Sequence, residues 1–277
     1  MSHPPDETST PVRGSTAGGQ RSVLRSVAVP AEHGGWGLTL EPAVLGLLIA
    51  PSGAGLCLAL AALLGFVART PLKLVLVDAS RHRHMERTRV ARRLVIAELF
   101  VLTALVSAAA LLALGPFWVP VTVAAPLIGA ELWFDMRSRS RRLVPELAGA
   151  VGISSVVAMI VLADGGDARL AAGLWLVLAA RSVTSIPFVR DQIARLHDRP
   201  RRPSTLLAAD LTAVGVAGTA VVLDCTLGAG ALAVVGVEAY QRISARAPLP
   251  PAVVIGVRQM VLGLVVVAVT AAGVLAA

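Results

Sequence analysis

Charged residues are scarce in this sequence. Asp, Glu, Lys and Arg together make up 15% of the 277 residues, whereas an ordinary soluble domain carries about a quarter. This scarcity argues against a soluble protein, and the hydrophobic share of 56% and the mean hydropathy of +0.75 support the same conclusion. Apolar runs of about 20 residues, the length that crosses ~30 Å of hydrocarbon as a helix, recur along the chain. The sequence therefore predicts an all-α, polytopic membrane protein.

Cysteine is also rare, and a signal-peptide pattern is missing. The two cysteines, Cys57 and Cys225, fall near the outer ends of predicted spans, and two unreactive buried thiols are favoured over a disulfide between them. The first 29 residues lack the apolar segment of a signal peptide and are rich in Ser, Thr, Gly and Pro. We expect residues 1–29 to be a disordered cytoplasmic tail and residues 30–277 to form the transmembrane domain.

Nine membrane spans are predicted from the apolar runs. They cover residues 35–50, 54–77, 94–114, 117–134, 143–163, 169–189, 204–223, 225–241 and 251–276. The loops between the spans alternate between the two sides of the membrane. Those on one side contain a single basic residue, Arg169. Those on the other side contain Arg81, Arg83, Arg87, Arg89, Arg92, Arg93, Arg137, Arg139, Arg141, Arg142, Arg190, Arg195, Arg199, Arg201, Arg202, Arg242 and Arg246. By the positive-inside rule, the N-terminus is expected in the cytoplasm and the C-terminus outside.

The arginines of these loops also account for the formal charge of +8. A nucleic-acid-binding protein concentrates positive charge on one face of a soluble module. Here the charge lies in short loops between apolar spans, so we expect a lipid bilayer and no nucleic acid among the partners.

Ionisable residues also fall inside the predicted spans. They are Glu41, Arg69, Lys73, Glu98, Glu131, Glu146, Arg181, Asp210, Glu238 and Arg258, with Asp78 at a boundary. With the orientation above, all of them lie in the cytoplasmic half or near the middle. A single unpaired charge at the bilayer centre costs at least ~2.5–3.5 kcal/mol, so these groups are expected to face one another or water. The distribution predicts a charged cavity that opens to the cytoplasm, although snorkelling or simple pairing near helix ends would explain several of them.

The second span carries the densest group. Arg69 and Lys73 are four residues apart and share a helix face, where two cations require carboxylates or an anionic ligand opposite them. Asp78 lies about half a turn away from Arg69, so it joins them only if the helix unwinds, for which Thr70–Pro71 offers a place. Arg181 in the sixth span is the most central cation.

Two histidine-containing segments are weaker candidates. Glu32 and His33 are expected at the cytoplasmic membrane surface, where His33 is a candidate base or ligand. The group His82, His84 and Glu86 lacks the spacing of a specific metal site, and neighbouring arginines disfavour a cation. No metal or cofactor is predicted.

The segment Glu32-His33-Gly34-Gly35-Trp36, followed by Pro42 and by Arg69-Thr70-Pro71-Leu72-Lys73, resembles the YwiC-like family of bacterial integral membrane proteins. The resemblance extends over most of the chain after Val29. It implies a membrane location, and the family name implies no particular activity.

The chain more distantly resembles the UbiA-type intramembrane prenyltransferases. That family has nine membrane helices and places its functional motifs in the cytoplasmic loops after helices two and six, and Glu86-Arg87-Thr88 is similar to the segment after its first motif. The family uses aspartates to hold magnesium, whereas the corresponding positions here are mainly cationic, which repels Mg²⁺. The resemblance implies a UbiA-like fold that would hold an anionic head group directly on arginine and lysine.

Three functions remain open on this basis. The first is binding of an amphiphilic anion, such as a lipid or isoprenoid phosphate, by a degenerate prenyltransferase-like protein; whether it is an enzyme stays open. The candidate binding residues are Arg69, Lys73, Arg181, Arg258, Glu41, Glu98, Asp210, Asp78, Glu32 and His33. The second is transport of a small anionic or amphiphilic solute, which the apolar outer half disfavours. The third is a non-catalytic membrane scaffold whose charges pair only for packing.

Overall fold

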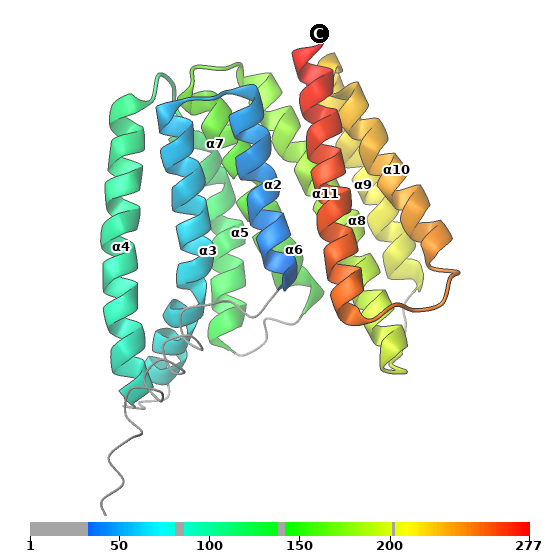
Figure 1. The fold of residues 1–277 in the computed structure, drawn as a ribbon, viewed down its shortest axis with the longest axis horizontal. Coiled ribbons are helices and arrows are strands. Elements are labelled where there is room, and N and C mark those ends of the chain that lie inside the picture. Colours follow the sequence, from blue (N-terminus) through cyan, green and yellow to red (C-terminus); the bar gives the residue numbers. More distant parts are fainter. Residues whose placement is uncertain (1–32, 81–85, 138–141, 201–202) are drawn as a thin grey trace, which may run out of the picture.

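The computed structural model describes residues 33–80, 86–137, 142–200 and 203–277, and within these ranges the chain is helical and contains no strand (Figure 1). The first part of the chain forms α2 (His33–Ile49), α3 (Gly53–Ser80), α4 (Glu86–Leu112), α5 (Trp118–Met136), α6 (Leu143–Ser154) and α7 (Val156–Ala163). The second part forms α8 (Ala168–Leu196), α9 (Pro203–Leu223), the short 3₁₀ helix η1 (Cys225–Leu227), α10 (Gly228–Ser244) and α11 (Ala252–Leu275). The expected cytoplasmic tail and the cluster of His82 and His84 lie outside the described residues.

The helices run up and down through one bundle, so the all-α membrane fold predicted from the sequence is confirmed (Figure 1). Within the described residues, seven helical segments are long and apolar enough to cross a membrane: α3, α4, α5, the consecutive pair α6 and α7 taken together, α8, α9 and α11. The remaining α-helices of the described chain, α2 and α10, have 17 residues each, and Gly35–Ile49 of α2 is a shorter apolar helix. Apolar side chains cover the outside of the bundle, as expected where lipid replaces water.

Helix ends differ from the predicted spans at one side of the bundle. There α3 continues to Ser80, α4 already begins at Glu86, and α8 continues to Leu196. The apolar runs define only the part inside hydrocarbon. In α4 and α8, arginine-rich sequence, which favours helix, extends the helix beyond it, whereas α3 gains only Asp78, Ala79 and Ser80. α3 also passes through Pro71 as one helix, so the unwinding considered at Thr70–Pro71 does not occur.

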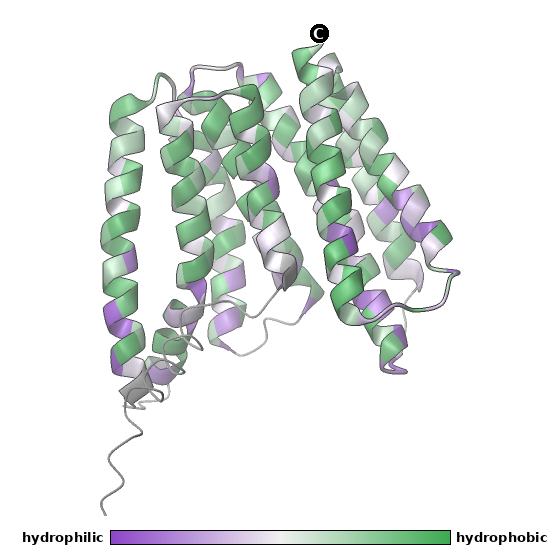
Figure 2. Ribbon diagram, in the orientation of Figure 1, coloured by the Kyte–Doolittle hydropathy of each residue, from purple (hydrophilic) through white to green (hydrophobic). Residues whose placement is uncertain are grey.

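Polar residues gather in one half of the bundle (Figure 2). The extremity of this half, which we call the basic end, is where α2, α4, α9 and α11 begin and where α3, α5, α8 and α10 finish. At the opposite end, Asp167 caps α8 by accepting hydrogen bonds from the backbone N–H groups of Arg169 and Leu170. These hydrogen bonds lower the pKa of the Asp167 carboxyl, and the bond from Leu170 has the largest effect.

Two segments form the centre of the bundle. In the most apolar 18-residue stretch of α8, and in that of Leu143–Ala163, 67% of the residues are buried. In the corresponding stretch of α4 only 11% are buried. Leu174 and Leu178 of α8 pack with Leu45 of α2 and Val157 of α7 in the largest apolar core. Among the described helices, α3 is the only one that α4 contacts extensively. Most of the α4 surface therefore faces lipid.

The fifth span is broken in its middle. The N–H of Ser155 donates to the carbonyl of Gly152, three residues back, instead of to Val151, and α6 ends there. The Val151 carbonyl accepts a hydrogen bond from the indole Nε1 of Trp175 in α8, with an N–O distance of 2.7 Å. The break is therefore satisfied inside the protein and offers no free carbonyl to a ligand.

Replacing Trp175 with phenylalanine is expected to destabilise the bundle by about 1–3 kcal/mol, because it leaves the carbonyl of Val151 without a donor. Thermal unfolding of the purified protein in mild detergent measures the effect. Trp118→Phe is the matched control, since Trp118 is 59% exposed and forms no comparable bond among the described residues. Equal unfolding temperatures for the two variants would contradict this role of Trp175.

Candidate functional site

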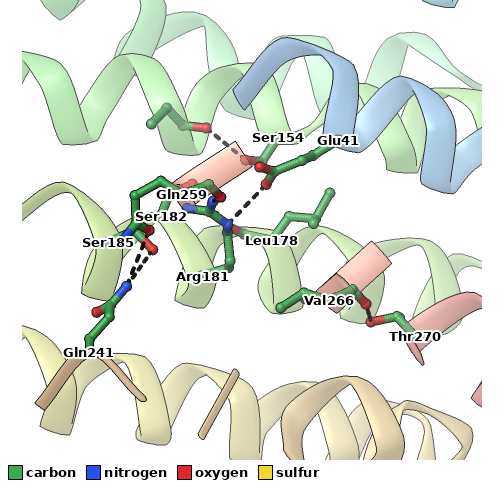
Figure 3. Close-up of polar contacts among 11 residues, drawn as sticks. Glu41, Ser154, Leu178, Arg181, Ser182, Ser185, Gln241, Gln259, Val266 and Thr270 are labelled. Carbon is green, nitrogen blue, oxygen red and sulfur yellow. Dashed lines mark hydrogen bonds and ion pairs between the residues drawn. The ribbon is translucent and has the colours of Figure 1, made fainter. Parts of the chain in front are cut away.

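The centre of the basic half holds a buried ion pair between α2 and α8 (Figure 3). The Arg181 Nε lies 3.1 Å from the Glu41 Oε2, and each side chain is 3% exposed. The Arg181 Nη2 also donates to the backbone carbonyl of Gln259 in α11. Arg181 thus joins three helices, and the charge that the sequence places at depth is neutralised by Glu41.

A glycine of α11 makes room for this pair. A Cβ added to Gly263 would overlap the Glu41 carboxylate and come within 2.8 Å of the Arg181 Nη2. Only a residue without a side chain allows α11 to approach the two charged groups this closely. The position of Gly263 is therefore part of the site.

Neutral polar side chains extend the site from the ion pair toward α10. The Gln241 Nε2 donates to the Gln259 Oε1 and to the Ser185 hydroxyl, at 3.3 Å in both cases (Figure 3). The Thr184 hydroxyl donates to the Gln241 Oε1 at 3.2 Å. These four residues are each at most 7% exposed, so the contacts form inside the bundle.

The network continues to α9 and ends at the surface. The Thr184 hydroxyl also lies 2.8 Å from the Asp210 Oδ1, and the Asp210 Oδ2 lies 2.6 Å from the Arg242 Nη2. The Arg242 side chain is 55% exposed. A polar chain therefore connects the buried Glu41–Arg181 pair with the surface through five helices, α2, α8, α11, α10 and α9.

A second charged group lies between α3 and α5. The Arg69 Nη2 is 2.7 Å from the Glu131 Oε1 and 3.0 Å from the Asp135 Oδ2, and the Lys73 Nζ is 3.3 Å from the Asp135 Oδ1. The Asp135 side chain is 3% exposed, whereas those of Arg69 and Lys73 are 30% and 38% exposed. A Cβ on Gly149 of α6 would overlap the Glu131 carboxylate, so α6 closes over this group. The two cations are balanced by two carboxylates of the protein.

Arg258 of α11 is held differently. Its Cζ lies 6.0 Å from the ring centroid of Phe188 and 5.7 Å from that of Tyr240. Within the described part of the chain, Arg258 forms no hydrogen bond or salt bridge, and its Nε is buried without a partner. Aromatic faces attract a guanidinium and fix its plane, but they leave its positive charge uncompensated.

The other predicted residues are dispersed. Asp78 is buried and accepts a hydrogen bond from Thr88 of α4, on another face of α3 from Arg69, as its spacing indicates. Glu98 is partly exposed on α4 and has an unpartnered buried oxygen. Glu32 lies outside the described residues; His33 begins α2.

The predicted charged residues thus form separate groups. Arg181, Glu41 and Asp210 belong to one network, and Arg69 and Lys73 belong to the group between α3 and α5. Sequence analysis missed Asp135, which lies just past the predicted span, and it missed Gln241 and Gln259, which carry no charge. A sequence search for every polar residue at the depth of Glu41 and Arg181 would have included both glutamines.

Within the described residues, no group of three or more His, Cys, Asp or Glu side chains is arranged to hold a metal ion. Asp135 faces Arg69 and Lys73, and Asp210 faces Arg242, which are environments that disfavour a divalent cation. The chemistry that these groups offer is charge-assisted hydrogen bonding.

Comparison with known proteins supports the resemblance seen in the sequence. Residues 29–161 match the family model described as YwiC-like protein, which confirms the resemblance for this part of the chain. Searches of curated proteins and of solved structures found no match. The distant likeness to UbiA-type enzymes therefore stays a prediction.

Proposed function

We propose that this multi-pass membrane protein, YwiC-like over residues 29–161, binds an amphiphilic anion at the basic end, with the anionic head group on Arg258. The observation that carries the proposal is the uncompensated charge of Arg258. Arg69, Lys73 and Arg181 each have a carboxylate within 3.3 Å, whereas among the described residues Arg258 has only the rings of Phe188 and Tyr240. An anion on Arg258 would remove the cost of a lone charge at membrane depth.

The surroundings of Arg258 favour an amphiphile over a free ion. Arg258 lies six residues into α11, about 9 Å along the helix. Val261 and Val265, about one and two turns further into the bundle, are 51% and 48% exposed, and Tyr240 is 43% exposed. Lipid-facing side chains thus continue from the cation along α11. The head group would contact Arg258 while the apolar tail lies along these valines.

This proposal narrows the set of binding residues suggested by the sequence. Because Arg69 and Lys73 are balanced by Glu131 and Asp135, a ligand there would have to compete with two carboxylates. Arg181 is inside the bundle and paired with Glu41. We assign these three cations to holding the helices together, with the basic end in the cytoplasm by the positive-inside rule.

Replacing Arg258 with glutamine is expected to reduce retention of anionic lipid by at least about tenfold, which corresponds to ~1.4 kcal/mol. Native mass spectrometry of the protein titrated with phosphatidic acid and, in parallel, with phosphatidylcholine measures the loss. Phosphatidic acid should bind the unmodified protein more tightly, because its phosphate lacks a compensating cation.

Arg246→Gln is the matched control. Arg246 lies at the same end and is exposed, so the substitution removes the same charge without touching the aromatic contacts. An equal loss in both variants would show only general attraction to the basic end and would refute a site at Arg258. Uptake of an anion into vesicles that contain only this protein would instead indicate transport.

A further inference from the structure

One face of α8 carries a line of polar and aromatic residues. Arg181, Ser185, Phe188, Gln192 and Arg195 follow one another at intervals of four, three, four and three residues, which places them along a single stripe of a continuous helix. The stripe runs from the middle of the bundle to the basic end, where the Arg195 Nη1 donates to the Ala245 carbonyl just after α10.

This stripe faces α10 and α11. Ser185 accepts a hydrogen bond from Gln241 of α10, and the ring of Phe188 lies 6.0 Å from the Cζ of Arg258 in α11. Arg181 donates to the Gln259 carbonyl of α11. From Arg181 toward the basic end, the three helices therefore meet along a seam lined by polar side chains. Beyond Arg181 the same three helices contribute Val177, Val234 and Val266 to the apolar core.

Several buried polar atoms in or beside the seam lack a hydrogen-bond partner among the described residues. Three of these atoms are the Gln192 Nε2, the Gln259 Nε2 and the Glu41 Oε1, on residues that are 1%, 7% and 3% exposed. They occur at successive levels, from near the basic end to the ion pair. Buried amides and carboxylates are nearly always hydrogen-bonded, and ordered water is the usual partner where the protein supplies none.

The polar line stops at the ion pair. On the side of Arg181 away from the basic end, the same face of α8 continues with Leu178 and Leu174, which are 1% and 0% exposed and belong to the apolar core. A polar path from the basic end is therefore closed at its inner end.

We propose that the seam between α8, α10 and α11 is a water-filled passage that leads from the basic end to the Glu41–Arg181 pair and ends there. Water in the passage completes the hydrogen bonds of Gln192, Gln259 and Glu41, and the passage admits small polar molecules from one side of the membrane only. The proposal does not depend on anion binding at Arg258, because none of these three residues belongs to that site.

Cysteine accessibility tests the passage, because thiosulfonate reagents react with a thiolate, which forms only where water reaches the sulfur. In a background with Cys57→Ser and Cys225→Ser, Ser185→Cys and Gln192→Cys place thiols in the seam. Ser182→Cys and Thr270→Cys are the controls. Ser182 and Thr270 are equally buried, at 1% and 0% exposed, but their hydroxyls bond only the carbonyls four residues back in their own helices (Figure 3).

A small positively charged thiosulfonate should modify the two seam variants at least about tenfold faster than the two controls, from the side of the basic end only. Seam variants that react less than tenfold faster than the controls, whether all four rates are slow or fast, would overturn the proposal. Hydroxyl-radical footprinting of the unmodified protein decides the question if a variant fails to fold. Phe188, 5% exposed, should then be oxidised more than Phe117, which is 9% exposed at the other end of the bundle. Less oxidation at Phe188 would overturn the passage.

Discussion

Replacing Arg181 with methionine is expected to destabilise the bundle by about 3–5 kcal/mol, because Glu41 then carries a buried charge without a partner. Methionine fills much of the arginine stem, so the loss reports the missing charge more than a cavity. Thermal unfolding of the purified variant in mild detergent, together with the folded yield from membranes, measures the effect.

Two further variants separate charge from packing. Adding Glu41→Gln to Arg181→Met removes both charges and should recover most of the lost stability, because a buried pair is worth little against a neutral replacement of similar size. Arg190→Met is the control for a pair near the surface: Arg190 contacts Glu146 at 2.8 Å, but the side chains are 38% and 34% exposed. We expect a cost below about 1 kcal/mol there. Equal losses of stability in Arg181→Met and Arg190→Met would show that the buried pair contributes no more to stability than the pair near the surface.

Gly263→Ala is expected to cost about 3 kcal/mol, near the upper end for overpacking, because the new methyl group takes the place of the Glu41 carboxylate. The carboxylate is buried on all sides and is held by Arg181, so it cannot move aside without giving up that contact. Either α11 separates from α2, or the ion pair breaks. The same detergent unfolding experiment measures the result.

Gly256→Ala in the same helix is the matched control, since a Cβ there meets no atom within 4 Å. Alanine favours a helix over glycine by up to about 1 kcal/mol, so this variant should be neutral or slightly stabilised. The two substitutions are chemically identical, but only Gly263→Ala is expected to destabilise the bundle. Stabilisation by both would mean that Gly263 is not in contact with the ion pair.

The general architecture could be predicted because each span satisfies its own backbone and displays its own apolar run. Arginines in alternate loops likewise follow a rule that depends only on the local sequence. Helix ends at the basic side could not be placed this way, because α3 and α8 continue through charged residues beyond the apolar runs.

The partners in the site were less accessible to sequence reasoning. The depth of Arg181 required a partner, but the choice of Glu41 depends on α2 packing beside α8, two helices far apart in the sequence. Arg69 and Lys73 were correctly expected to face carboxylates or an anion, and the structure supplies Glu131 and Asp135. Whether protein carboxylates or an anionic ligand face these cations depends on how α5 is rotated about its axis, which no single sequence pattern specifies.

The pairing of Arg181 has a consequence for biosynthesis. When α8 leaves the ribosome, its arginine faces an insertion cost of about 2.5–3.5 kcal/mol, and the two glutamines of the network, Gln241 in α10 and Gln259 in α11, have not yet been made. The carboxylate on α2, in contrast, was synthesised first and already lies in the bilayer. The first helix of the described chain therefore supplies the counter-charge for α8, and for this pair the order of the chain brings the carboxylate into the membrane before the arginine.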